Sequence, residues 1–165
     1  RRAPRRDAPL EVRPVAGGAG RAQLVLGSIP IAYGYERTSF PMYFNQSPLL
    51  NVQGAQRNQR SEGMDTSVTN AIERQRARTI VRWTPKADEL LVSGLLDNGD
   101  EMAGRAVVVD APLGAGHVVL FGTRPMWRWE SQGAFALMLN AMANWNALDA
   151  NARSAGPATV TNDNR

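Results

Sequence analysis

The chain has 165 residues, 43% of them hydrophobic, which is enough for one domain with a buried core. It has no cysteine, which excludes disulfides, thiolate zinc sites and a cysteine nucleophile. No run reaches the ~18 apolar residues of a membrane span, so we expect no membrane partner. The net charge is +4, but residues 1–21 hold six arginines against Asp7 and Glu11. The remaining chain is therefore neutral and offers no net field for nucleic acid.

Residues 1–21 are rich in Arg, Pro, Gly and Ala and have few large apolar groups. This composition predicts a basic linker or tail. The alternative is a polybasic arm that touches nucleic acid or an acidic surface. The chain begins with Arg and not with Met, so we expect a C-terminal piece of a longer protein.

The next segments are apolar but short. Leu24–Leu26 and Ile29–Tyr35 predict a short strand or packed loop, and Pro30 argues against a central strand there. Residues Thr38–Leu50 predict an aromatic segment that packs against a sheet edge; a ligand wall is the alternative. Its aromatic residues are Phe40, Tyr43 and Phe44.

The middle of the chain alternates polar and apolar segments. Residues Asn51–Gly63 predict an exposed loop, and Asp65–Arg78 a surface helix. Thr79–Trp83 and Leu90–Leu96 are apolar runs, the first of them a predicted strand. The Asn-Gly pair within Asp97–Glu101 predicts a turn.

Two β-branched runs, Ala106–Val109 and Val118–Phe121, flank the Gly-rich segment Pro112–Gly116. This pattern predicts a β-hairpin. Neither run alternates between apolar and polar residues, so we expect both faces of both strands to be covered, as in a layered α/β sheet.

Helical spacing follows, and we expect a helix over Gln132–Leu148 with Ser131 as its N-cap. Leu137 and Ala141 widen its predicted inner stripe. Residues 149–165 are small and polar and predict a disordered tail. The inner stripe consists of Phe135, Met138, Leu139, Met142 and Trp145.

Residues 104–145 read GRAVVVDAPLGAGHVVLFGTRPMWRWESQGAFALMLNAMANW. This string resembles the C-terminal end of certain bacterial zinc carboxypeptidases, relatives of carboxypeptidase A. After the peptidase domain these proteins carry a domain shaped like a class I glutamine amidotransferase. Pro30–Tyr35 and Leu91–Leu96 look like further parts of that domain, so the resemblance covers roughly residues 24–145.

The resemblance implies an α/β domain over residues 22–148. Its fold would be a three-layer amidotransferase-like (flavodoxin-like) sheet with a terminal antiparallel hairpin and a C-terminal helix. It implies a non-catalytic accessory domain whose partner is the catalytic domain of the same parent chain. Metal-dependent peptide hydrolysis, with its zinc, would lie outside these residues, in a secreted or periplasmic protein. The oligomeric state stays open.

A zinc carboxypeptidase needs a His-x-x-Glu pair, a later His and a Glu general base. The chain has one histidine, His117, so we expect no catalytic residue, metal ligand or cofactor in this fragment. A serine triad that uses His117 is formally possible, but no Gly-x-Ser-x-Gly elbow occurs. We interpret His117 as a partly exposed structural histidine at the start of a strand.

The candidate binding residues follow the hairpin and have two guanidinium groups near two indoles. Such a set could bind a carboxylate, a sugar or a partner domain. In an extended loop both indoles would lie on one side and Arg128 on the other. An interface requires at least one exposed indole; the alternative is that the indoles seal the helix against the sheet. The residues are Arg124, Trp127, Arg128, Trp129 and Glu130. A carbohydrate- or peptide-binding module that uses loop 124–130 is the alternative function.

Overall fold

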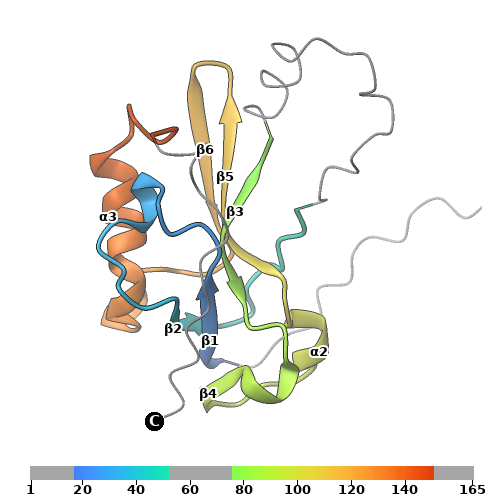
Figure 1. Ribbon diagram of the computed structural model, residues 1–165. Coiled ribbons are helices and arrows are strands. Elements are labelled where there is room, and N and C mark those ends of the chain that lie inside the picture. The colour runs from blue at the N-terminus through green and yellow to red at the C-terminus, as the bar shows by residue number, and fades with distance from the viewer. Residues whose placement is uncertain (1–16, 53–75, 151–165) are drawn as a thin grey trace, which may run out of the picture.

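A sheet of six strands forms the centre of the molecule, and every neighbouring pair within it is antiparallel (Figure 1). The structure, a computed structural model, describes residues 17–52 and 76–150. The strand order is β2-β1-β3-β5-β6, with β4 beside β1. The strands are β1 (Gly18–Leu24), β2 (Ser39–Phe44), β3 (Arg78–Trp83), β4 (Leu91–Gly94), β5 (Ala106–Leu113) and β6 (Gly116–Phe121).

The helices are short, and the longest follows the sheet. The α-helices are α2 (Gly99–Met102) and α3 (Phe135–Ala143). The 3-10 turns are η1 (Pro30–Ala32), η3 (Ala87–Glu89), η4 (Trp127–Trp129) and η5 (Gln132–Ala134). In Figure 1, α3 and η1 lie together on one side of the sheet, well away from α2. None of the helices described here is long and apolar enough to cross a membrane.

Strand β1 contacts three other strands. One of its edges pairs with β2, and the other pairs with β4 near Gly18 and with β3 from Ala22 to Leu24. The contact between β1 and β4 depends on glycine. Gly94 has φ +96°, and a Cβ there would lie 2.6 Å from the Cα of Gly18. Only a residue without a side chain lets the two backbones approach this closely.

The predicted hairpin is confirmed as β5 and β6. Residues 106–110 of β5 are all buried, so this strand is covered on both faces as expected. The expectation is wrong for β6, where Val118 and Leu120 are exposed. Because β6 lies at the edge of the sheet and packs only one face on the core, its outward residues remain in solvent.

The predicted helix 132–148 is present in a shorter form, as η5 followed by α3. Ser131 does not cap it: the residue has φ 52° and its side chain makes no capping hydrogen bond. Ala134, Leu137 and Leu148 are buried, and the predicted Ala141 packs against the core as a partly buried residue.

The predicted inner stripe of the helix is wrong in part. Leu139, Met142 and Trp145 are exposed, and we call these three residues the α3 outer face. The helix buries a different face from the one predicted, because hydrogen bonds fix the direction of Asn140. Nδ2 of Asn140 donates hydrogen bonds to the carbonyl oxygens of Ile31 (3.2 Å) and Tyr33 (2.7 Å), which turns this polar residue toward the η1 segment.

The other predicted elements agree with the structure more often in type than in their first and last residues. The edge segment is confirmed as β2 and the strand at 79–83 as β3, while α2 replaces the predicted turn at 97–101. The sheet begins at Gly18, within the segment predicted as a tail, and Arg78 belongs to β3 and not to a helix. Most of the predicted loop 51–63 and helix 65–78, and both terminal tails beyond 17–150, lie outside the described residues.

The mixed α/β class, the terminal antiparallel hairpin and the C-terminal helix are confirmed. The core lies between the sheet and the segments that cover it. Its fully buried large side chains include Phe44, Ile29, Ile31, Met42, Ile80 and Leu137.

Candidate functional site

The predicted binding residues lie in one exposed connection between β6 and η5, which we call the Arg/Trp loop (124–130). Trp127 is 41% exposed and Trp129 is 74% exposed. Arg124, Arg128 and Glu130 are exposed as well. The condition that an interface would need, at least one largely exposed indole, is therefore met.

The loop is folded into a turn and is not extended. The amide of Trp127 donates to the carbonyl of Arg124 (3.3 Å), and that of Glu130 to the carbonyl of Trp127 (2.9 Å). Arg128 and Trp129 have φ angles of 49° and 64°, in the left-handed region. The prediction that both indoles share one side was made for an extended segment, and this condition is not met in the turn.

Each indole contacts a neighbouring side chain among the described residues. The guanidinium carbon of Arg124 lies 4.6 Å from the ring centroid of Trp127, within cation–π range. The ring of Trp129 meets Phe135 edge to face, with centroids 5.4 Å apart. Trp129 thus contacts the first residue of α3 while most of its surface stays in solvent.

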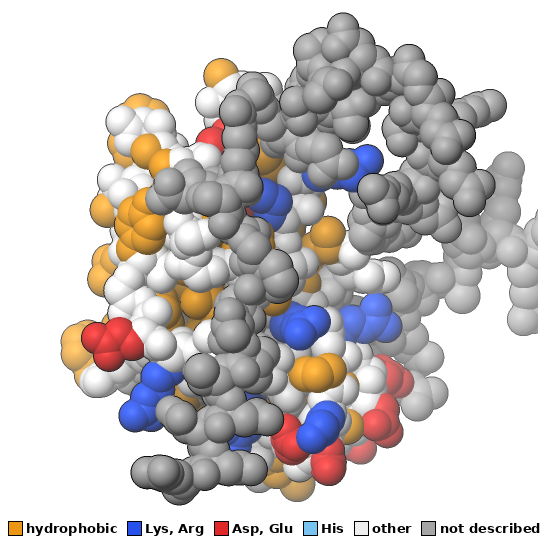
Figure 2. All heavy atoms as spheres, viewed as in Figure 1, with side chains coloured by type: hydrophobic (Ala, Val, Ile, Leu, Met, Phe, Trp, Pro, Cys, Tyr) orange, Lys and Arg blue, Asp and Glu red, His pale blue; other side chains and the backbone are white. Residues whose placement is uncertain are grey.

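Further apolar surface lies on the same side of the molecule. Figure 2 shows hydrophobic side chains gathered over α3, and charged side chains over α2 and β4. Trp145 of the α3 outer face is 73% exposed.

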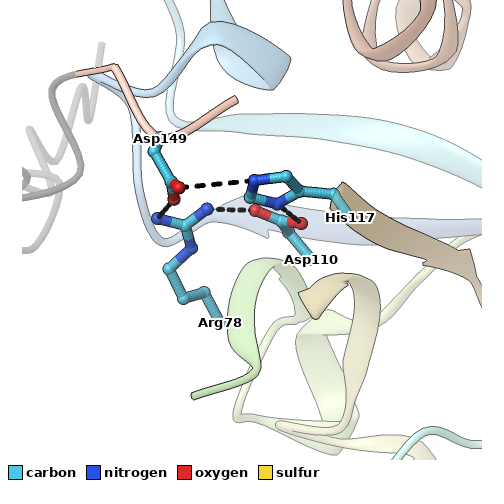
Figure 3. Close-up of polar contacts among 4 residues, drawn as sticks. All are labelled: Arg78, Asp110, His117 and Asp149. Carbon is cyan, nitrogen blue, oxygen red and sulfur yellow. Dashed lines mark hydrogen bonds and ion pairs between the residues drawn. The ribbon is translucent and has the colours of Figure 1, made fainter. Parts of the chain in front are cut away.

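A second polar constellation joins β3, β5, β6 and the segment after α3 (Figure 3). We call its members, Arg78, Asp110, His117 and Asp149, the charge cluster. Arg78 Nη2 forms an ion pair with Asp110, and Nη1 lies 3.0 Å from Asp149 Oδ1. His117 Nδ1 lies 2.8 Å from Asp110 Oδ1, and Nε2 lies 3.4 Å from Asp149 Oδ2.

Burial is uneven within the charge cluster. The Asp110 side chain is fully buried, those of His117 and Arg78 are 10% and 14% exposed, and that of Asp149 is 60% exposed. Both ring nitrogens of His117 face carboxylates, and the residue is of intermediate exposure, in agreement with the partly exposed histidine that we expected. Asp149 lies in the segment predicted as a disordered tail, yet its carboxylate contacts both Arg78 and His117.

The cluster was missed because its members are far apart in sequence, although part of it follows from the hairpin. Arg78 and Asp110 are direct cross-strand partners, and His117 lies opposite Pro112. Asp110 and His117 are therefore diagonal neighbours on one face of the hairpin. Arg78 forms ion pairs with both carboxylates, those of Asp110 and Asp149. Within 17–52 and 76–150, no group of three or more His, Asp or Glu is arranged to hold a metal ion.

Comparison with protein-family models, with curated proteins and with solved structures gives no match to this chain.

Proposed function

We propose that the chain is a non-catalytic accessory domain of a secreted or periplasmic protein that resembles a bacterial zinc carboxypeptidase. In this proposal the Arg/Trp loop docks on the catalytic domain of the same parent chain. The sequence resemblance over residues 104–145 supports the family, and the exposure of Trp129 supports the docking role. The peptidase zinc would be held elsewhere, because His117 is the only histidine and shares its cluster with a cation, Arg78.

We also propose that the fold is a variant of the three-layer amidotransferase-like scaffold. The support is the sequence resemblance and the succession of β5, β6, loop and α3, which follows the order in the resembling family. The scaffold is usually built on a mostly parallel sheet, whereas every described pair here is antiparallel. A variant of this kind would keep the C-terminal hairpin and helix and rearrange the strands before them.

The observation that carries the docking proposal is the conformation of the loop. A non-glycine residue in the left-handed region costs of order 1 kcal/mol or more, and Arg128 and Trp129 are two in succession. In this strained conformation the large indole of Trp129 is exposed to solvent. Exposed Trp and Arg side chains are the types that most often dominate binding energy at protein interfaces.

The test is to measure binding of this chain to the separately produced peptidase domain of its parent protein by calorimetry. Replacing Trp129 with Ala is expected to weaken binding by ~2 kcal/mol, or roughly thirtyfold. Trp145→Ala is the matched control, because this indole is equally exposed but lies outside the loop. Equal losses in the two variants, or no measurable binding by the unmodified chain, would contradict the proposal.

A carbohydrate- or peptide-binding module is the second candidate, favoured by the open ring of Trp129 beside Arg128. Aromatic faces stack on sugar rings and guanidinium groups pair with carboxylates. Titration of the isolated chain with oligosaccharides and with peptides, followed by tryptophan fluorescence, distinguishes this candidate. Saturable quenching that is lost in Trp129→Ala, without affinity for the peptidase domain, would favour it over docking.

A further inference from the structure

An open cavity of about 560 Å³ lies at the surface between β3, β5 and α2, and its lining includes no residue of the Arg/Trp loop or of the charge cluster. Its volume is in the range of small-molecule sites. Val25, Leu50 and Val52 supply apolar lining, while Arg82, Arg105 and Asp100 supply the charged lining. The cavity therefore has the two kinds of surface that an amphiphilic small molecule requires.

The two arginines of the cavity lack carboxylate partners within the described residues. Arg82 makes no side-chain hydrogen bond or ion pair there, and Arg105 uses only Nε, which donates to the carbonyl oxygen of Glu101 (3.2 Å). Arg78, four residues before Arg82 on the same strand, is by contrast paired with two aspartates. The planar guanidinium groups of Arg82 and Arg105 are thus available for bidentate contacts with an anion.

The surroundings distinguish between kinds of anion. Backbone amides of residues 103, 104 and 105 already donate to carbonyl oxygens of Gly99, Thr84 and Met102, at 2.9, 3.0 and 3.1 Å. A nest of unused amides, which phosphate sites typically use, is therefore missing from this wall. Asp100 offsets one of the two arginine charges, so the cavity matches a single negative charge better than two.

We propose that this cavity binds a small monoanionic carboxylate with an apolar body, of the size of an N-acylated apolar amino acid. The carboxylate contacts Arg82 and Arg105, and the apolar body lies against Val25 and Leu50. The proposal does not rest on the docking role of the Arg/Trp loop, and either can fail without the other.

The test is an NMR titration of the isotope-labelled full chain with N-acetyl-leucine. We expect saturable shifts of the backbone amides of Arg82 and residues 104–106. N-acetyl-leucinamide has the same apolar body without the charge and is expected to give no saturable shifts. Inorganic phosphate is the competing anion and is expected to bind more weakly than N-acetyl-leucine.

Arg82→Gln is expected to weaken N-acetyl-leucine binding roughly tenfold or more, because it removes charge-assisted hydrogen bonds. Arg37→Gln is the matched control, since Arg37 is exposed and does not line the cavity. Should Arg82→Gln alter the fold, as judged from its spectrum, Arg105→Gln provides the same comparison. The proposal is overturned by equal binding of acid and amide, by tighter binding of phosphate, by unchanged affinity in the arginine variants, or by no saturable shifts at all.

Discussion

At the scale of single residues, Arg78 is the side chain whose loss should cost most among the polar residues. It neutralises Asp110, which is fully buried, and replacing Arg78 with Met would leave that carboxylate without its cation. Breaking a buried ion pair from one side typically costs ~3–5 kcal/mol. We expect a loss of this size in the free energy of unfolding, measured by denaturant titration.

Lys86→Met is the control for Arg78→Met. Lys86 pairs with Glu89 at 2.6 Å, but both side chains are exposed, so the exchange is expected to leave the unfolding midpoint nearly unchanged. Similar midpoints for the two variants would show that the charge cluster does not stabilise the fold.

The raised pKa of Tyr35 predicts that the free energy of unfolding falls at alkaline pH. Burial raises the pKa of Tyr35 from 10.0 to about 12, and a hydrogen bond with the backbone of Leu137 opposes the shift in part. The folded state therefore favours the neutral phenol, whose hydroxyl donates to the carbonyl oxygen of Gly133. This contribution is complete below pH 10, the pKa of the unfolded chain, and is lost as the pH rises through about 12.

Tyr35→Phe isolates this effect. Tyrosinate absorbance of the native chain is expected to include one late titration that Tyr35→Phe lacks, out of three tyrosines in all. The variant should also lose less stability than the native chain between neutral pH and pH values above 10. Titration curves of the native chain and of Tyr35→Phe that show no difference near pH 12 would contradict the assignment.

At the scale of elements, the Arg/Trp loop should be separable from the stability of the sheet. Trp129 is 74% exposed, so Trp129→Ala is expected to change the melting temperature little. Trp83 of β3 is 3% exposed and packs edge to face on Phe44, with centroids 6.0 Å apart. Trp83→Ala should therefore cost ~3–5 kcal/mol in the free energy of unfolding.

Thermal melts of the two tryptophan variants test this contrast directly. If Trp129→Ala destabilised the chain as much as Trp83→Ala, the loop would be part of the folded core. The exposure of Trp129 would then not support a binding role for the loop.

The elements also show which patterns can be read from sequence. Hairpin β5–β6 was predictable because two β-branched runs flank a glycine-rich turn and their pairing is local. The inner face of α3 was not, because apolar residues occur nearly all around the helix. Hydrogen bonds from Asn140 to the η1 segment select the buried side, and no periodicity encodes them.

At the scale of the whole molecule, some features of the candidate site could be predicted from the sequence and others could not. The Arg/Trp loop could be predicted as an exposed group of residues, because its members are adjacent in sequence. Its left-handed turn could not, since Arg128 and Trp129 are not residue types that favour positive φ. The charge cluster needed the pairing of β3 with β5 and the return of Asp149, both of which are non-local.

The position of β1 between three strands has a consequence for how the chain acquires its structure during synthesis. Of the strands described, β1 leaves the ribosome first, and β2 soon follows to pair with one edge. The other edge stays unpaired until β3 and β4 have been synthesised, because Ala22 pairs with Trp83 and Gly18 with Gly94. Such long loop closures are slow, whereas hairpin β5–β6 can close on the microsecond scale.

An unpaired strand edge is a template for pairing with other chains. Nascent chains are consequently most vulnerable to misassembly in the interval between the synthesis of Phe44 and that of Gly94. Lower temperature or slower initiation of translation, which reduce encounters between nascent chains, should raise the yield of native protein. We expect this gain to exceed that from substitutions that stabilise the folded state.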